Sequence, residues 1–300
     1  MNTINTPKGH TQNDTNNKTY WLTAMGRYFN IDMRYQPMQS NNEIGRARQA
    51  MTTLIVARFG LTSPSVVSHL YRISHRQALE HLNKLVKQGL LIMVNTHRSV
   101  DGCIYICDAS GAKYAEELTG IPVYFRRITP PERGVNLNTV MHDLMNSHVL
   151  LTMMREAARH DQGYYAYRGM VTEKECKRLF KNTDSRIVDG LLLEVTDTGT
   201  STIALEVENS FKNKAQRSTI LRKYVAALRA GIYDKVFLVT QSEDIFADIK
   251  RLHEQLFVEL PQIKDKKTRQ PILTQADADL LRRSIIFRTK YCDELTKIFY

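Results

Sequence analysis

Residues 186–224 have the sequence RIVDGLLLEVTDTGTSTIALEVENSFKNKAQRSTILRKY, and this stretch decides the fold of the chain. Ile187 to Val195 is apolar and contains β-branched residues, which predicts a strand. Residues 196–200 have the composition of a turn, and Ser201 to Glu208 alternates with a period of two, so a second strand follows in a hairpin. Residues 212–230 then repeat apolar side chains at helical spacing. The order predicted here is strand, turn, strand and helix.

Three carboxylates lie on the two predicted strands. Asp189 interrupts the apolar first strand, and Glu206 and Glu208 share one face of the second, because successive side chains of a strand alternate. If the hairpin register brings these faces together, the three carboxylates meet, and they repel one another unless a cation lies between them. Oxygen ligands suit Mg²⁺ or Mn²⁺, so we expect all three to bind such an ion. The alternative is that Glu206 and Glu208 form the solvated face of an ordinary strand, but carboxylates such as Asp189 are seldom buried without a partner.

A run of basic residues without an acidic one follows Glu208. Such a run suits a phosphate backbone that approaches the carboxylates. We expect nucleic-acid contacts from Lys212, Lys214 and Arg217.

The composition of the whole chain points in the same direction. Its 300 residues allow two domains, and 42 Lys and Arg against 31 Asp and Glu give a net charge of +11, which favours a polyanionic partner. No apolar run is long enough for a membrane span, and no signal peptide is expected. The four cysteines form no paired CxxC motifs, which argues against structural zinc and favours a reduced, cytoplasmic setting.

Residues 43–107 predict a winged helix-turn-helix. A helix from Ile44 to Phe59 ends at Gly60, a second helix covers residues 64–71, and Ser74 caps a third. Two strands near residues 90–94 and 103–107 form the wing. The start of the third helix reaches base edges in such domains. We therefore expect base contacts from His75, Arg76 and Gln77, and phosphate contacts from Lys84, Lys87 and Arg98.

The stretch from Glu43 to Val100 carries eight basic residues against two acidic ones. This excess favours DNA binding over the alternative, a dimerisation or protein-docking module.

A resemblance follows from the order of these parts. Asp189-Gly190 followed by Glu206-Val207-Glu208 resembles the PD-(D/E)xK restriction-endonuclease-like core, with Glu208 in place of the usual Lys. With a winged helix in front, His142-Asp143 at a helix start and Lys223-Tyr224 on the following helix, the chain resembles the replication-relaxation proteins, in particular the MobC-type plasmid mobilization relaxases. The resemblance covers about residues 43–240.

The resemblance implies an α/β (α+β) fold in two domains. Residues 1–42 are expected to form a flexible tail and an N-terminal extension. Residues 1–18 are expected to be mobile, whereas the more aromatic stretch from Tyr20 to Tyr35 packs on a domain or forms a short helix, with a DNA-contacting arm as the less favoured alternative. A winged helix DNA-binding domain covers 43–120, a linker rich in Pro and Gly covers 121–136, and a nuclease-like domain covers 137–300.

The implied activity is that of a relaxase, which recognises a transfer origin of a plasmid or mobile element and cleaves one DNA strand by metal-dependent chemistry. Asp189 and Glu206 would hold the Mg²⁺ or Mn²⁺ ion, and Glu208 would be a third ligand or a general base. Lys212 or Lys223 would supply the positive charge that the missing Lys no longer gives. An accessory mobilization protein and a coupling protein are the implied partners.

Two further side chains have open roles. His142 has a catalytic or phosphate-positioning role, or it forms a capping or interdomain hydrogen bond. Tyr224 suggests a covalent nucleophile, but a packed tyrosine is favoured.

Two other functions remain as alternatives. One is a DNA-binding regulator or replication initiator whose nuclease-like domain is a degenerate scaffold. The other is a non-specific defence or restriction nuclease.

Overall fold

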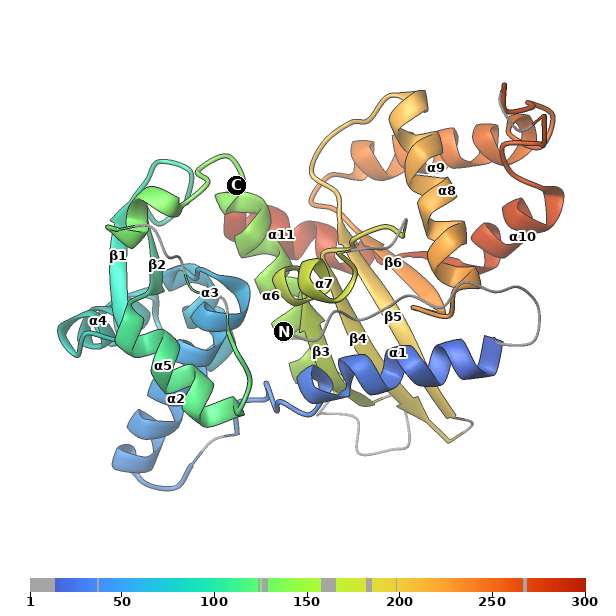
Figure 1. Ribbon diagram of the computed structural model, residues 1–300. Helices are drawn as coiled ribbons and strands as arrows, with labels where there is room; N and C mark the ends of the chain where they lie inside the picture. Colours follow the sequence, from blue (N-terminus) through green and yellow to red (C-terminus); the bar gives the residue numbers. More distant parts are fainter. Residues whose placement is uncertain are drawn as a thin grey trace.

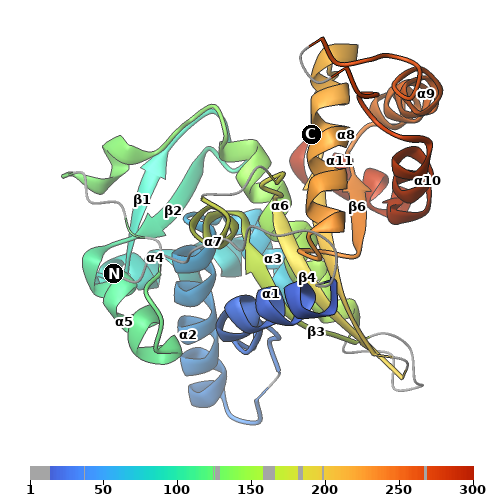
Figure 2. The ribbon, with the colours of Figure 1, turned by 45° about the vertical axis from the view of Figure 1, so that its right-hand side comes forward.

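The structure, a computed structural model, describes residues 14–36, 38–123, 125, 129–157, 166–181, 185–197, 199–266 and 269–300. It is a mixed α/β protein with a two-stranded and a five-stranded sheet. In both ribbon views the elements of residues 41–119 lie together on one side of the molecule, and the five-stranded sheet lies on the other (Figures 1 and 2).

The first group of elements has the order expected from the sequence. Helices α2 (Asn41–Phe59), α3 (Pro64–Tyr71) and α4 (His75–Lys87) are followed by strands β1 (Leu91–Asn95) and β2 (Cys103–Cys107) and by helix α5 (Ala109–Thr119). The two strands pair antiparallel, as expected. The assignment of these elements to a winged helix-turn-helix domain stays a prediction.

Local signals explain where two of these helices begin and end. Ser40 and Ser74 each form a capping box with the residue three positions on, which satisfies free N–H groups of the first turns of α2 and α4. Gly60 ends α2 with a φ of 89°, a left-handed conformation that glycine adopts without strain.

The second sheet contains the predicted hairpin. Its strands are β3 (Ala166–Thr172), β4 (Gly190–Thr196), β5 (Gly199–Val207), β6 (Lys235–Val239) and β7 (Ile285–Phe287), in the order β3-β4-β5-β6-β7. The pairs β3–β4 and β4–β5 are antiparallel, whereas β5–β6 and β6–β7 are parallel. The antiparallel register of β4 and β5 runs from Gly190 opposite Leu205 to Thr196 opposite Gly199, so the predicted hairpin is confirmed.

Helices cover both faces of this sheet. They are α6 (Val140–Ala157), α7 (Glu173–Leu179), α8 (Lys214–Arg229), α9 (Glu243–Glu259), α10 (Gln275–Ser284) and α11 (Cys292–Phe299). Alternate strand residues belong to different hydrophobic clusters: Leu192 and Leu205 pack with α6, whereas Leu191 and Ala204 pack with α8 and α9. The sheet therefore separates two cores, as the period of two requires.

The core on the α6 side continues into the first group of elements. It joins Leu54 of α2 and Ile104 of β2 to Leu150 of α6 and Leu205 of β5. In addition, the buried Arg58 of α2 forms an ion pair with Glu175 of α7 at 2.7 Å. The parts on either side of the predicted linker thus pack directly against each other. Linker residues 124 and 126–128 lie outside the described residues.

The expected N-terminal tail is corrected in part. Helix α1 (Asp14–Phe29) runs along the five-stranded sheet (Figure 1) and buries Trp21, Met25 and Phe29 in the α8 and α9 core. Lys18, within the stretch predicted to be mobile, forms an ion pair with Asp234 at 2.8 Å. Apolar side chains at helical spacing therefore order this segment despite its many Asn and Thr residues. Residues 1–13 lie outside the described part of the chain.

Helix α1 approaches the sheet so closely that one strand position must be glycine. A Cβ atom on Gly169 of β3 would lie 2.0 Å from the carbonyl oxygen of Phe29.

Among the described helices, none combines the length and the apolar content that a bilayer crossing requires.

Candidate functional site

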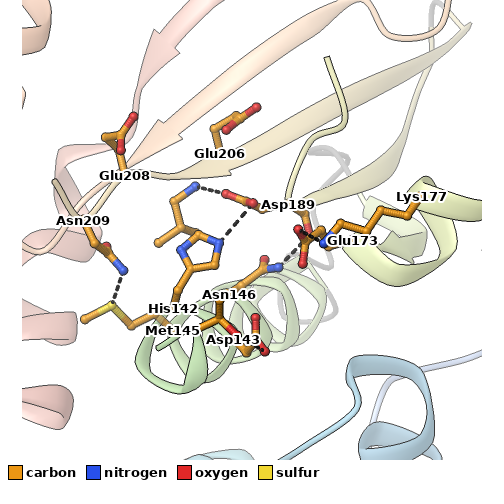
Figure 3. A network of polar contacts seen from close by, with 12 residues as sticks. His142, Asp143, Met145, Asn146, Glu173, Lys177, Asp189, Glu206, Glu208 and Asn209 are labelled. Carbon is orange, nitrogen blue, oxygen red and sulfur yellow. Dashed lines mark hydrogen bonds and ion pairs between the residues drawn. The ribbon is translucent and has the colours of Figure 1, made fainter. Parts of the chain in front are cut away.

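Three carboxylates gather at one end of the β4–β5 hairpin (Figure 3). Asp189 directly precedes β4. Glu206 is the second-last residue of β5, and Glu208 directly follows that strand. The Asp189 N–H donates to the Leu205 carbonyl at 3.0 Å and Gly190 pairs with Leu205, so Asp189 lies opposite Glu206. The side chains are nearly inaccessible, since the three residues are 7%, 4% and 6% exposed. The hairpin register on which the sequence argument depended is therefore present for Asp189 and Glu206, and Glu208 follows two residues after Glu206.

Arg186 neutralises Glu206. Its Nε and Nη2 atoms donate to the two carboxylate oxygens of Glu206 at 2.8 Å and 2.9 Å, which is the bidentate geometry of strong charge-assisted hydrogen bonds. Arg186 lies three residues before Asp189 and outside the predicted strand. The alternation of side chains along a strand therefore does not predict where its side chain points. Sequence reasoning therefore missed this residue.

Two basic residues hold Glu208. Lys212 donates to one carboxylate oxygen, and Arg217 Nη1 donates to the other at 3.2 Å. Arg217 is only 1% exposed, so the prediction that it contacts DNA is corrected: its charge faces a buried carboxylate. The amphipathic pattern of α8 places Arg217 on the buried face beside Ile220 and Leu221.

Helix α6 supplies the partners of Asp189. His142 Nε2 lies 3.1 Å from Asp189 Oδ1, and Asn146 Nδ2 donates to the Asp189 carbonyl at 2.6 Å. The Val207 N–H donates to Asp189 Oδ2 at 2.7 Å. The helix comes this near because the next residue is glycine: a Cβ on Gly190 would lie 2.6 Å from a methyl carbon of Leu150.

These contacts shift the pKa values of the site. Burial raises the pKa of Asp189, but the charge and hydrogen bond of His142, with the Val207 N–H, outweigh burial and hold it below its usual value. Burial and the neighbouring Asp189 raise the pKa of Glu206 to about 7, although Arg186 opposes the change. Burial lowers the pKa of His142, but Asp189 more than compensates and raises it to about 9. At neutral pH His142 is therefore a cation and a hydrogen-bond donor rather than a general base.

The donor set fits a hard divalent ion, because it consists of carboxylate oxygens. The three carboxylates nevertheless do not converge on one point as predicted. Among the described residues, the group of three His, Cys or acidic side chains with all ligand atoms within 4.8 Å of one another is a different one, His69, His148 and Glu294. The physical reason is that Asp189, Glu206 and Glu208 each turn toward a basic partner of their own.

The two residues of the predicted Lys223-Tyr224 pair have different environments. Lys223 is exposed on α8, and the positive charges beside the carboxylates come instead from Arg186, Lys212 and Arg217. Tyr224 is 1% exposed, and burial together with Glu206 raises its pKa well above the usual value. The favoured interpretation of a packed tyrosine agrees with this environment, because a nucleophile must reach DNA and lose its proton.

The residues predicted to contact DNA from the first group of elements are solvent-exposed. They are His75, Arg76, Gln77, Lys84, Lys87 and Arg98. Several already have local partners: His75 Nε2 lies 2.6 Å from Asp101 Oδ1, and Arg76 pairs with Glu80 at 2.9 Å.

Lys214 of α8 also has a local partner, since it pairs with Glu259 of α9. A phosphate that binds the ammonium group of Lys214 would therefore compete with the carboxylate of Glu259.

Comparisons with known proteins do not assign the site. No protein-family model, curated protein or solved structure compared with the chain matches it. The functional interpretation therefore depends on the residues and their geometry.

Proposed function

We propose that this protein is a DNA relaxase, a metal-dependent endonuclease that nicks one strand at a transfer origin of a plasmid or mobile element. The observation that carries the proposal is the burial of three carboxylates, Asp189, Glu206 and Glu208, at one end of the hairpin, with His142 beside Asp189. Ordinary solvated strand faces do not bury three carboxylates at adjacent positions, because burial of charge is costly.

The carboxylates are the proposed ligands of a Mg²⁺ or Mn²⁺ ion. Such an ion would supply charge neutralisation on the scissile phosphate and a water of lowered pKa. The raised pKa of Glu206 supports this role, because burial and Asp189 disfavour the charged carboxylate more than Arg186 favours it, and a bound cation would stabilise that charge.

Arg186 is the proposed phosphate ligand of the site. Its guanidinium is held by Glu206 and its side chain is 29% exposed, so it reaches both the buried carboxylate and the solvent. A guanidinium binds phosphate oxygens as well as carboxylates in a bidentate manner. On DNA binding, Arg186 transfers from Glu206 to the phosphate and frees Glu206 as a ligand.

His142 has a positioning role in this proposal. Its side chain is 30% exposed and its pKa of about 9 keeps the proton at neutral pH. It therefore donates to a phosphate oxygen while Asp189 fixes its ring. In this proposal the first turn of α6, which carries His142, lies against the end of the hairpin because it contributes this donor.

DNA would be held by two surfaces. In the proposed winged helix of residues 43–120, His75, Arg76 and Gln77 lie at the exposed start of α4 and suit base contacts. Near the carboxylates, Phe211 directly precedes Lys212 and is 64% exposed. An exposed aromatic ring beside a basic residue suits stacking on an unpaired base.

The remaining parts of the proposal come from the resemblance to the MobC-type relaxases. They are an accessory mobilization protein and a coupling protein, whereas the proposed cytoplasmic setting comes from the cysteine pattern. The positive net charge of +11 agrees with a nucleic-acid partner.

One observation favours a second function, a non-catalytic DNA-binding regulator or replication initiator. Each of the three carboxylates already has a basic partner: His142 for Asp189, Arg186 for Glu206, and Lys212 with Arg217 for Glu208. Buried ion pairs of this kind satisfy the charges without a metal ion.

Supercoiled DNA that carries a candidate transfer origin separates the functions. The purified protein is incubated with this DNA with and without Mg²⁺ or Mn²⁺. A relaxase gives metal-dependent open circles nicked at one position. Fragments cut at many positions would instead indicate a general nuclease, and DNA that is shifted in a gel but uncut would indicate a regulator.

A further inference from the structure

A second group of ligating side chains lies away from the carboxylates of the hairpin. His69 of α3, His148 of α6 and Glu294 of α11 come together from three helices, and their ligand atoms all lie within 4.8 Å of one another. The Nε2 atoms of both histidines are 3.0 Å from the same oxygen, Glu294 Oε1. His148 is buried, whereas the side chains of His69 and Glu294 are 29% and 27% exposed. The group is therefore reachable from solvent on one side.

No protonation state of His69 gives it favourable hydrogen bonds to both of its neighbours in this group. His69 Nε2 lies 3.0 Å from Glu294 Oε1 and 2.7 Å from Arg155 Nη2. If the nitrogen carries a proton, it donates a hydrogen bond to Glu294, but its N–H then points at the N–H of Arg155 and repels it. If it carries a lone pair, it accepts from Arg155 but faces a carboxylate oxygen. Because a ring nitrogen is either a donor or an acceptor, one of the two contacts is always repulsive.

We propose that His69, His148 and Glu294 form a binding site for a divalent transition-metal ion of the zinc class. Zn²⁺ bonds of about 2.0–2.1 Å at tetrahedral angles place neighbouring ligand atoms ~3.3 Å apart. The two observed nitrogen–oxygen distances of 3.0 Å are close to this spacing. Two imidazole nitrogens and one carboxylate form a donor set that such ions use.

Two neighbours of the group fit the proposal. Thr152, one helical turn after His148, is buried and its Oγ1 has no hydrogen-bond partner among the described residues. Together with His69 and His148 it lines a small pocket, so a buried polar atom without a partner lies beside the two proposed imidazole ligands. Arg155 also donates through Nη1 to the His69 carbonyl at 2.7 Å, and this bond holds the side chain when Nη2 leaves His69.

The ion would join parts of the chain that are far apart in sequence. Helix α3 belongs to the group of elements predicted to bind DNA, while α6 carries His142 and α11 lies near the end of the chain. A shared ligand set fixes these helices relative to one another. The site differs in chemistry from the carboxylates of the hairpin, because imidazole ligands do not suit Mg²⁺.

Titration of the metal-free full-length protein with Co²⁺ tests the proposal. Co²⁺ replaces Zn²⁺ in such sites and gives visible absorption. The titration is carried out in excess Mg²⁺, which occupies the proposed carboxylate site; under these conditions we expect one equivalent of Co²⁺ to bind per chain and Zn²⁺ to displace it. Glu294→Gln and His69→Asn are expected to weaken binding at least about 100-fold, because each removes a direct ligand, a larger loss than the 10–100-fold effect of an indirect partner.

Matched controls keep the test independent of folding and of the carboxylates of the hairpin. Asp293→Asn changes the exposed neighbour of Glu294, and His97→Asn changes an exposed histidine elsewhere; both should bind Co²⁺ like the parent. Circular dichroism checks that each variant is folded. The proposal is overturned if the parent binds no stoichiometric Co²⁺, or if folded Glu294→Gln and His69→Asn bind it as tightly as the parent.

Discussion

The pair of His142 and Asp189 sets the protonation of the proposed active site. Asp189 is buried and holds the ring of His142 at 3.1 Å, which raises the pKa of His142 to about 9. A charged histidine does not accept a proton. In the proposed relaxase His142 would therefore position a phosphate rather than act as a general base.

The first prediction concerns the pH dependence of stability. Because the folded-state pKa of His142 lies above its usual value of 6.5, its contribution is fully present below about pH 6.5 and is lost as the pH rises to about 9. The stability advantage of the parent over His142→Gln should therefore be largest near pH 6 and shrink toward pH 9.5. Urea unfolding across this range measures it.

His97→Gln is the control for this series, because His97 is exposed. Its stability difference from the parent should show no comparable loss between pH 6.5 and 9. If the difference for His142→Gln stays constant or grows over that interval, the coupling of His142 to Asp189 is wrong.

At the scale of elements, a buried ion pair fixes α2 against α7. Arg58 donates from Nε and Nη2 to both carboxylate oxygens of Glu175 at 2.8 Å and 2.7 Å, and Nη2 also donates to the Met170 carbonyl. Glu175 in turn accepts from the Thr172 N–H at the start of α7. One side chain thus links the predicted DNA-binding elements to the five-stranded sheet.

The second prediction follows from the burial of this pair. Arg58→Met leaves Glu175 without its charge partner and should lower the free energy of unfolding by about 3–5 kcal/mol, the usual cost of an uncompensated buried charge. Urea unfolding followed by circular dichroism measures the loss.

The double variant Arg58→Met/Glu175→Gln is the matched comparison. It removes both charges and should recover part of the stability, because no buried charge remains. A single variant as stable as the parent, or a double variant that is no more stable than the single one, would contradict the coupling.

The sequence predicted the elements of the hairpin well, because both of their signals are local. Strand alternation gave the faces of β4 and β5, and turn composition gave the connection, so the adjacency of Asp189 and Glu206 followed from spacing alone. The packing of residues 20–35 was expected from their aromatic content, but the ordered start of α1 at Asp14 was not, although Trp21, Met25 and Phe29 repeat at intervals of four. Their apolar stripe was the available signal, and the polar composition around it obscured it.

The partners of the carboxylates were not predictable in the same way. Arg186 precedes its strand, and the direction of its side chain depends on the packed surroundings rather than on periodicity. Arg217 was assigned to DNA from its charge, but the buried face of α8 decides its position. His69, His148 and Glu294 meet only through tertiary folding, since no sequence spacing relates residues on α3, α6 and α11.

At the scale of the whole molecule, positive charge is distributed over two parts that share a core. The first group of elements carries exposed Lys84 and Lys87 on α4 and Arg98 after β1. The hydrophobic core that joins this group to α6 and the sheet holds the two parts together. DNA bound by the proposed winged helix would therefore be presented to a fixed neighbour rather than to a loosely tethered domain.

The third prediction concerns the salt dependence of DNA binding. If Lys84 and Lys87 each contact a phosphate, the double variant Lys84→Gln/Lys87→Gln binds more weakly at low salt. The slope of log affinity against log salt should also fall by about 1.8, since each phosphate contact contributes about 0.9. Fluorescence anisotropy with labelled duplex DNA at several salt concentrations measures both quantities.

Lys113→Gln serves as the control, because Lys113 is exposed on α5 and lies 3.9 Å from Glu117. It should leave the slope unchanged. An unchanged slope in the Lys84 and Lys87 variant would remove α4 from the DNA-binding surface.

The most direct measurement compares metal-dependent nicking of supercoiled origin DNA by the parent, Asp189→Asn and Glu194→Gln. Glu194 is the matched control, because it is also a buried carboxylate of β4 with a basic partner, Lys235 at 3.0 Å, but lies toward the other end of the strand. We predict that Asp189→Asn lowers the nicking rate at least about 100-fold, since a metal ligand is lost, and that Glu194→Gln nicks like the parent. Nicking by folded Asp189→Asn at the parental rate would contradict the proposed site.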